Sequence, residues 1–492
     1  MLDRLNPVLV KEVRQALRGR IFRLSLALTL VAASLATTVL VLAQPPEEAV
    51  ERGVEYATTI YACLAVALMA IVPFSAFQSM GAEWEESTFD LLVLSDLPPR
   101  RIVIGKWLSS FVLALLFLSA FLPFFTFAFL LRGVDLLALA AVVVGTLLVS
   151  GVLSASAIAI SSSTPQRFVR LIIVVALAAG LLSLVPAAVG IFYQVLTNAG
   201  ILADPDAQIV FAWLGVAGLL SVAMSIAIAC ARLAHAEENR SSGLRLIGSL
   251  GIVAGLLATA HFYGRWGQPM IVLGMAVMIF LSLFGAGAWL CVEPLPLGRR
   301  VRKQVPRFPG LGLAIAPWLP GGTRGMLYVL LHAGAIFLVL HQILGSAPST
   351  PSSTLRVGLN AQQIELVLFV VVLYGTLYLG VPLLFFGRNL ARMNVRRMAL
   401  GSIAAFAALA SLGPSIYGLV VDDEALQEGQ HLGMPGFLLE RIGDHPDGLD
   451  ALTRLNLQWL AFAAGFVLLL HLPRWGAALL EVQRAANARR AR

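Results

Sequence analysis

The apolar residues of this chain are gathered into long runs, and this feature constrains the fold more than any other. About twelve runs approach or exceed the ~20 residues that an α-helix needs to cross a bilayer. They lie at residues 21–43, 57–79, 107–131, 136–160, 169–196, 209–231, 246–263, 269–291, 326–344, 365–386, 399–421 and 459–480. Since backbone polar groups in a bilayer must be hydrogen-bonded within the chain, such runs form helices. The sequence therefore predicts an all-α, polytopic integral membrane protein.

Composition supports the same class of protein. The chain is 59% hydrophobic and 13% charged, against about 45–50% and about 25% in soluble domains. A net charge of +8 is compatible with nucleic-acid binding, but the basic residues are spread between the hydrophobic runs. Membrane topology explains that distribution better, so no nucleic-acid partner is expected.

The basic residues also predict an orientation. With a cytoplasmic N-terminus, nearly all Lys and Arg residues fall in cytoplasmic segments, as the positive-inside rule requires. The exceptions are Arg52, Arg132, Arg265, Arg356, Arg441 and Arg454. This asymmetry predicts a multi-pass protein of the cytoplasmic (inner) membrane with both termini cytoplasmic.

A polar linker at residues 232–245 divides the chain into two membrane domains. A six-span domain at 21–231 precedes the linker, and a second six-span domain at 246–492 follows it and carries an acidic external loop at 422–458. The residues of the two domains do not match, so the sequence does not support an internal duplication.

Residues 1–20 are predicted to form an amphipathic helix in the cytoplasmic interface. Asn6-Pro7 is a typical helix start, with a capping side chain followed by proline. An apolar face then opposes a basic one, an arrangement typical of helices that lie along a membrane surface and contact its lipid. The apolar face contains Leu9, Val13, Ala16 and Leu17.

A charged stretch at residues 81–106 separates the second and third apolar runs and is too polar to span. Ser87 and Asp90 have the spacing of a capping box. Phe89, Leu92 and Val93 follow at helical spacing and make one apolar stripe. Pro98-Pro99 ends the helix, because proline disfavours helix in the residue before it. The pattern predicts a short helix that docks on a protein partner.

Two segments resemble a known family. Residues 81–106 contain acidic residues followed by T-x-D-L-L-x-L and L-x-P-R-R-I-x-x-G-K, and they resemble the first cytoplasmic loop of type-2 ATP-binding-cassette (ABC) permeases. The segment NPVLVKEVRQALRGR resembles the elbow helix of the same family. Ser87 and Asp96 depart from the Gly and Pro that are common there.

The resemblance implies the permease subunit of an ABC transporter whose loop carries a coupling helix, with export as the usual direction of transport in the family. The implied partners are a separate ATP-binding subunit and a second permease, as a homodimer or heterodimer. The coupling residues that it implies are Glu83, Glu85, Glu86, Thr88, Phe89, Asp90, Leu92, Val93, Arg100, Arg101 and Lys106.

The sequence carries no nucleotide-binding motif of its own. Gly105-Lys106 is followed by Trp107 and lacks both the upstream glycine and the Ser/Thr of a phosphate-binding loop. If ATP drives this protein, another chain binds it. We therefore expect no enzymatic activity and no cofactor. The cysteines, Cys63, Cys230 and Cys291, have no metal-ligand spacing.

Other candidate residues have more than one interpretation. Phe121, Phe124 and Phe125 surround Pro123 in the third run and could line an apolar substrate path, or face lipid, or pack between helices. Ionisable groups inside a membrane can form a proton relay, but a histidine can also be neutral there, and no acidic residue lies near these in the sequence; they are His332, His341 and His471. A metal site in the external loop is only weakly indicated, because its candidate ligands are irregularly spaced; they are His431, Asp444 and His445.

Two other classes of function remain open. A secondary transporter needs buried charges or broken helices near the bilayer midplane, and the runs contain almost no deep charge. A non-transporting membrane scaffold is excluded neither by composition nor by spacing. The substrate cannot be identified from the sequence.

The topology can be tested by cysteine labelling in intact cells. Cysteines introduced at Ser349 and Gly429 should react with a membrane-impermeant thiol reagent, because both positions are predicted to be external. A cysteine at Asn239 should not react. Labelling at Asn239 without labelling at Gly429 would show that the topology is inverted or that the span count is wrong.

Overall fold

The computed structural model describes residues 6–42, 53–85, 98–131, 134–163, 167–234, 238–294, 297–346, 359–387, 390, 392–420, 442 and 451–490. Side chains are described for most of these residues, but not for 84–85, 167–169, 199, 393, 409–420 and 451–452. The predicted coupling helix at 87–97 and most of the external loop at 422–458 lie outside the described residues.

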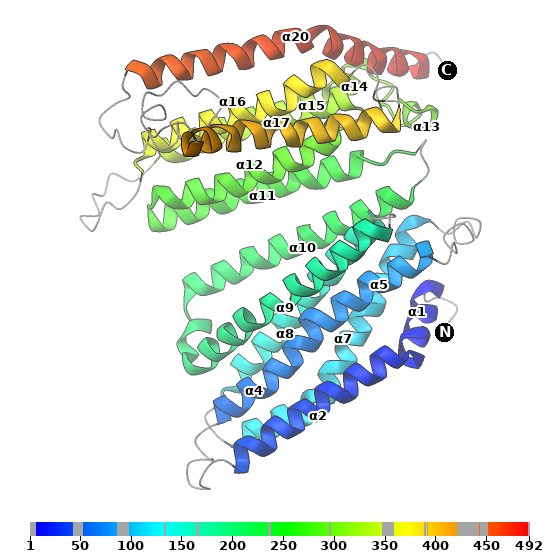
Figure 1. The fold of residues 1–492 in the computed structure, drawn as a ribbon, viewed down its shortest axis with the longest axis vertical. Helices are drawn as coiled ribbons and strands as arrows, with labels where there is room; N and C mark the ends of the chain where they lie inside the picture. The colour runs from blue at the N-terminus through cyan, green and yellow to red at the C-terminus, as the bar shows by residue number, and fades with distance from the viewer. Residues whose placement is uncertain are drawn as a thin grey trace. The chain divides into compact units, whose positions relative to one another are not determined.

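The chain forms two compact units, Met1–Ala234 and His235–Arg492, so the boundary lies inside the linker expected at 232–245. The elements of the first unit are α1 (Pro7–Arg18), α2 (Arg20–Leu42), α4 (Gly53–Ala65), η2 (Val66–Ile71), α5 (Val72–Glu85), α7 (Pro99–Leu130), α8 (Leu136–Ser162), α9 (Arg167–Thr197), η3 (Ala199–Leu202) and α10 (Pro205–Leu233) (Figure 1). Its core lies where α4, η2, α7, α8 and α9 meet.

The second unit contains two kinds of element. Its elements are α11 (Ser242–Trp266), α12 (Pro269–Cys291), α13 (Arg299–Arg302), α14 (Pro309–Ala314), η4 (Ala316–Trp318), α15 (Gly322–Gly345), α16 (Ala361–Phe386), α17 (Met393–Val420) and α20 (Ala451–Arg490) (Figure 1). Long helices α11, α12, α15, α16 and α17 share one core, while the short elements between α12 and α15 form a second core with α20.

The predicted fold class is confirmed. Eleven helices of the described residues are long and apolar enough to cross a membrane, and no strand occurs among those residues. A further helix, α17, covers the run expected at 399–421. The predicted helix start at Asn6 is also confirmed, because the Asn6 side chain accepts a hydrogen bond from the Val8 N–H and Pro7 is the first helical residue.

The second span contains a π-helical segment, η2, whose cause is a proline. Pro73 has no N–H, so the carbonyl groups one turn before it lose their usual donor. The Val72 N–H bonds to the Ala67 carbonyl in the π pattern. The Leu68 carbonyl instead accepts a hydrogen bond of 2.5 Å from the Ser150 hydroxyl of α8. A side chain of another helix thus satisfies the backbone group that the proline frees.

The role of this hydrogen bond can be tested with Ser150→Ala, which removes the hydroxyl from a buried site. We expect a loss of about 1 kcal/mol of stability, the typical size of a hydrogen bond between membrane helices. Thermal unfolding in detergent measures the effect. Ser183→Ala is the control, because the Ser183 hydroxyl is exposed and bonds within its own helix. Equal unfolding midpoints for both variants would contradict the interpretation.

Candidate functional site

The candidate site is the place where α5 ends and α7 begins, on either side of the stretch at 86–97, and we call it the base of that stretch. The second span ends there with Glu83 in the last turn of α5, and the third span begins there at Pro99 of α7. The N-terminal helix α1 packs against α7 at the same place (Figure 1). Three elements from separate parts of the sequence therefore meet at the base of this stretch.

A buried ammonium group joins these three elements. Lys106 of α7 is 1% exposed, and its Nζ lies 2.7 Å from Glu12 Oε1 of α1 and 3.3 Å from Glu83 Oε1 of α5. It also donates to the Ser79 carbonyl at 3.0 Å. The second cation is Lys11, whose Nζ lies 3.1 Å from Glu83 Oε1 at the solvent-exposed edge. We call Lys11, Glu12, Glu83 and Lys106 the ionic clamp.

Close backbone contact supports the ionic clamp. The Asn6 side-chain amide donates to the Arg101 carbonyl at 2.6 Å, which fixes the start of α1 to the first turn of α7. A Cβ atom on Gly105 would lie 2.9 Å from both Asn6 Nδ2 and Val8 Cβ. Only a residue without a side chain allows α1 to approach α7 this closely. The Gly-Lys pair at 105–106 is therefore a packing feature in this structure.

A second buried cation braces the end of α5 from another direction. Arg170, near the start of α9, donates from Nη1 to the Gly81 carbonyl at 3.0 Å and from Nη2 to the Ser161 hydroxyl at 3.2 Å. Its guanidinium carbon lies 5.7 Å from the centre of the Phe77 ring. A Cβ atom on Gly81 would overlap the guanidinium group. Gly81 thus leaves the space that Arg170 fills.

The structure places the predicted coupling residues in three settings. Arg100 and Arg101 are exposed on the first turn of α7. Glu83 and Lys106 are buried and bind each other, so the Glu83 carboxylate, which was expected to face a partner, lies against cations of its own chain. The remaining predicted residues lie outside the described residues or side chains; they are Glu85, Glu86, Thr88, Phe89, Asp90, Leu92 and Val93.

The three candidate phenylalanines of α7 lie in or against the core of the first unit. Phe121 and Phe125 are buried in the core of the first unit, and Phe124 packs against that core. The rings of Phe121 and Phe124 lie 5.9 Å apart. This is the helix-packing alternative considered from the sequence, and a substrate path along these rings stays a prediction.

The histidines of the spans are held by polar neighbours. His332 bonds through Nε2 to the Ser249 hydroxyl and through Nδ1 to the Tyr328 carbonyl. His471 bonds to the Gly380 carbonyl. His341 lies 3.1 Å from Glu365, an acidic partner distant in the sequence, and both side chains are partly exposed at helix ends. None of these contacts forms a chain across a span.

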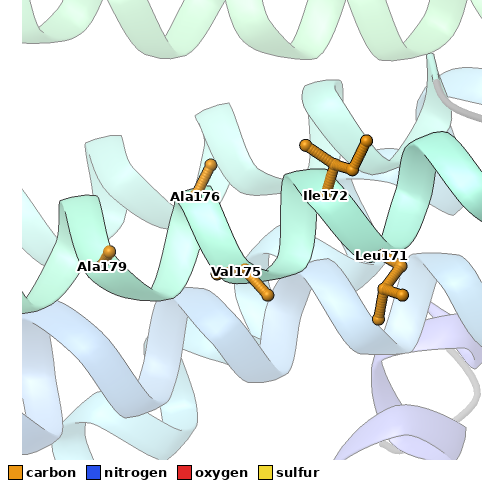
Figure 2. A pocket seen from close by; sticks show the side chains of 5 residues that line it. All are labelled: Leu171, Ile172, Val175, Ala176 and Ala179. Atoms are coloured by element: carbon orange, nitrogen blue, oxygen red, sulfur yellow. The ribbon is translucent and has the colours of Figure 1, made fainter.

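The structure offers no evident metal or ligand site among the residues that it describes. No group of three or more His, Cys, Asp or Glu residues there could hold a metal ion. His431, Asp444 and His445 lie outside that part of the chain. An open depression of about 440 Å³ runs along α9, and its lining is entirely aliphatic (Figure 2). Such a surface is ordinary for a helix that faces lipid or another helix.

The second unit contains buried charges in comparable positions. Arg245 of α11 binds Glu293, just after α12, at 2.8 Å and donates to the carbonyls of Pro317 and Leu319. Arg324, in the first turn of α15, binds Glu481 of α20 at 3.2 Å. Here too, buried cations at helix ends hold the segment that connects two spans.

Sequence reasoning did not identify Glu12 or Arg170. The position of Glu12 was a usable signal, since it lies one helical turn after Val8 and is the only acidic residue of α1. An acid between an apolar stripe and a basic one suggests a partner within the chain. No comparable signal marks Arg170, whose partners are a carbonyl and a hydroxyl of other helices.

Comparison of the chain with protein-family models, with curated proteins and with solved structures finds no match. What the structure establishes is a multi-pass helical membrane protein in which buried charges join the end of the second helical span, the start of the third and α1.

The ionic clamp predicts unequal effects for its two lysines. Lys106→Met leaves two buried carboxylates without their shared cation, and breaking a buried pair in this way costs about 3–5 kcal/mol. Lys11→Met removes an ammonium group that is 54% exposed, so its effect should stay below about 1 kcal/mol. Thermal unfolding in detergent provides the comparison.

A triple variant serves as the control. Combining Lys106→Met with Glu12→Gln and Glu83→Gln removes all the buried charges of the ionic clamp together and should restore much of the lost stability. If Lys106→Met alone were as stable as Lys11→Met, the ionic clamp would contribute little to the fold.

Proposed function

We propose that this protein is the membrane-spanning subunit of an ABC-type transporter, with the stretch at 86–97 as its contact to a separate ATP-binding subunit. The observation that carries the proposal is the ionic clamp. It joins the two segments that resemble the elbow helix and the coupling loop of type-2 permeases, although they are about ninety residues apart in the sequence. Buried charges that bind each other on either side of the stretch fix the relative positions of the helices that enter and leave it.

The clamp gives the proposed contact a mechanical role. Glu83 ends one span, Lys106 begins the next and Glu12 belongs to α1, so a force on the intervening stretch reaches all three helices together. Arg170 adds α9 through Gly81. In the proposed mechanism, ATP binding closes the partner subunits, and the braced base carries that movement into the spans. The spans then alternate access between the two membrane faces.

In this proposal, one set of charged side chains positions the stretch and another set contacts the partner. Glu83 and Lys106 are engaged inside the chain, so they position the stretch rather than contact the partner. The exposed guanidinium groups of Arg100 and Arg101, together with Glu85 and Glu86, are the groups left to tune the encounter with a partner. Phe89, Leu92 and Val93 supply the apolar contact surface, as the sequence pattern predicts.

The resemblance implies transport in the export direction, with a second permease chain as a further partner. A secondary transporter is less well supported by the contacts. The His341–Glu365 pair lies at helix ends and is partly exposed, whereas ion coupling requires charged groups near the bilayer midplane.

The decisive experiment uses the double variant Phe89→Ala with Leu92→Ala. Each buried apolar side chain contributes roughly 1.5–3 kcal/mol, so the pair should weaken association with the ATPase about a hundredfold or more. The candidate partners are P-loop ATPases encoded by neighbouring genes. The measurement is their co-purification with this chain, combined with substrate-stimulated ATP hydrolysis in vesicles.

The matched control is Phe127→Ala with Leu130→Ala, which removes the same side chains from an exposed site at the other end of α7. It should leave association unchanged. Charge reversal at Glu85 and Glu86 should weaken association mainly at low salt, because rim ion pairs contribute about 1 kcal/mol or less. If the Phe89/Leu92 variant binds and transports like the parent protein, the stretch is only a connector and the proposal fails.

A further inference from the structure

The segment between α12 and α15 presents a group of exposed cations at an edge of the second unit. Arg299, Arg300, Arg302, Lys303 and Arg307 are all exposed, and we call them the basic surface. No acidic residue occurs between Gly298 and Pro320. This concentration of one charge sign is independent of the ionic clamp in the first unit.

The basic surface is held in place from its inner side. Val301 and Val305 are buried against Val482 and Ala486 of α20. Glu481 of α20 accepts a hydrogen bond from the Leu297 N–H and binds both Arg302 and the buried Arg324. Arg489 of α20 donates to the Val305 carbonyl. The cations are therefore displayed on a packed segment and not on a free loop.

The charges of the basic surface are only partly neutralised within the chain. Glu238 binds Arg300 at 2.8 Å, and Glu481 binds Arg302 at 3.2 Å. Among the described residues, no carboxylate forms an ion pair with Arg299, Lys303 or Arg307. A cluster of exposed positive charge with this excess attracts an anionic surface.

Two large apolar side chains stand beside these cations. Phe308 directly follows Arg307 and is 69% exposed, and Leu311, in the next turn, is 52% exposed. Prolines at 306 and 309 flank Phe308 and restrict the backbone on both sides. Exposed apolar side chains next to basic ones are the combination that binds at a lipid interface.

The chain connectivity places this segment at a membrane surface. The preceding candidate span, α12, ends at Cys291, and the following one, α15, begins at Gly322. Both ends of the segment are therefore anchored where a span leaves the bilayer. The contacts of Arg245, near the start of α11, with the carbonyls of Pro317 and Leu319 bring a third span end to the same place.

We propose that the basic surface binds the headgroups of anionic phospholipids in the leaflet reached by these span ends, with Phe308 and Leu311 inserted between the lipids. Clusters of four or more Lys and Arg residues next to a span attract anionic lipids by about fivefold in affinity for each basic residue. An acidic protein explains the cations, but a lipid surface explains both the cations and the adjoining exposed Phe and Leu side chains.

The test measures which lipid surrounds position 308. The full chain, with Cys63, Cys230 and Cys291 replaced by alanine, receives Phe308→Cys carrying a fluorophore and is placed in nanodiscs. The nanodiscs contain phosphatidylcholine and phosphatidylglycerol, and the quencher is attached to one lipid or the other at equal mole fraction. Several-fold stronger quenching by labelled phosphatidylglycerol is expected. The difference in quenching between the two labelled lipids should decrease as the NaCl concentration rises, because salt screens exposed charges.

Matched variants distinguish the effect of the basic surface from the effect of positive charge elsewhere on the protein. Lys303→Gln with Arg307→Gln should bring the quenching ratio close to one, whereas Arg307→Lys should retain the enrichment. Arg265→Gln with Arg454→Gln removes two exposed cations from the opposite ends of α11 and α20 and should change nothing.

Three results would overturn the proposal. The first is equal quenching by both lipids in the parent protein at low salt, a result that needs no folded variant. The second is an equal loss of enrichment in the control pair. The third is a fluorophore at position 308 that a water-soluble quencher reaches and neither labelled lipid does.

Discussion

No water is available inside a bilayer, so each backbone N–H and C=O group there must find its partner within the protein. This constraint accounts for the all-helical architecture and for its irregular points. Pro73 removes one donor from the second span, the helix widens into η2, and the Ser150 hydroxyl of α8 bonds to the Leu68 carbonyl. Elsewhere the same two helices are joined by the Ser161 hydroxyl and the Phe77 carbonyl. The second span and α8 are therefore joined twice by small hydroxyl side chains that satisfy backbone groups of the neighbouring helix.

The same lack of water restricts where charges can lie. The strongly buried charges of the spans stand near span ends and have partners: Glu83 lies in the last turn of α5, and cations lie near the starts of the following helices, Lys106 in α7, Arg170 in α9, Arg245 in α11 and Arg324 in α15. In each unit, a carboxylate at the end of the second span is held by a buried cation. The partners differ, because Glu83 is held by Lys106 from the start of the third span, whereas Glu293 is held by Arg245 from α11, the first span of its unit. The two units thus use one physical solution with different residues.

The sequence predicted the features that depend on local pattern. The apolar runs correspond to helices, the α12 run matches at both ends, and Asn6-Pro7 begins α1. The predicted apolar face of α1 was incomplete, because its most buried residues are Val8 and Glu12. The contacts of Glu12, Arg170 and Glu481 could not be predicted, since each joins residues far apart in the chain. One sequence without covarying positions contains no measure of such distances. The stretch at 86–97 lies outside the described residues, so its helix stays a prediction.

The main effect of the ionic clamp is to fix the relative positions of the helices, and its contribution to stability is secondary. Replacing a buried ion pair with well-packed apolar residues is often neutral or stabilising, because desolvation of the charges offsets their attraction. Apolar contacts, however, permit two helices to slide, whereas Lys106 Nζ must lie within hydrogen-bond distance of Glu12, Glu83 and the Ser79 carbonyl at once. Gly105 and Gly81 remove the side chains that would keep α1 and Arg170 away. The hypothesis that follows is that α1, α5 and α7 move as one body. That property is the one a protein needs if a contact on the stretch between α5 and α7 is to move several spans together.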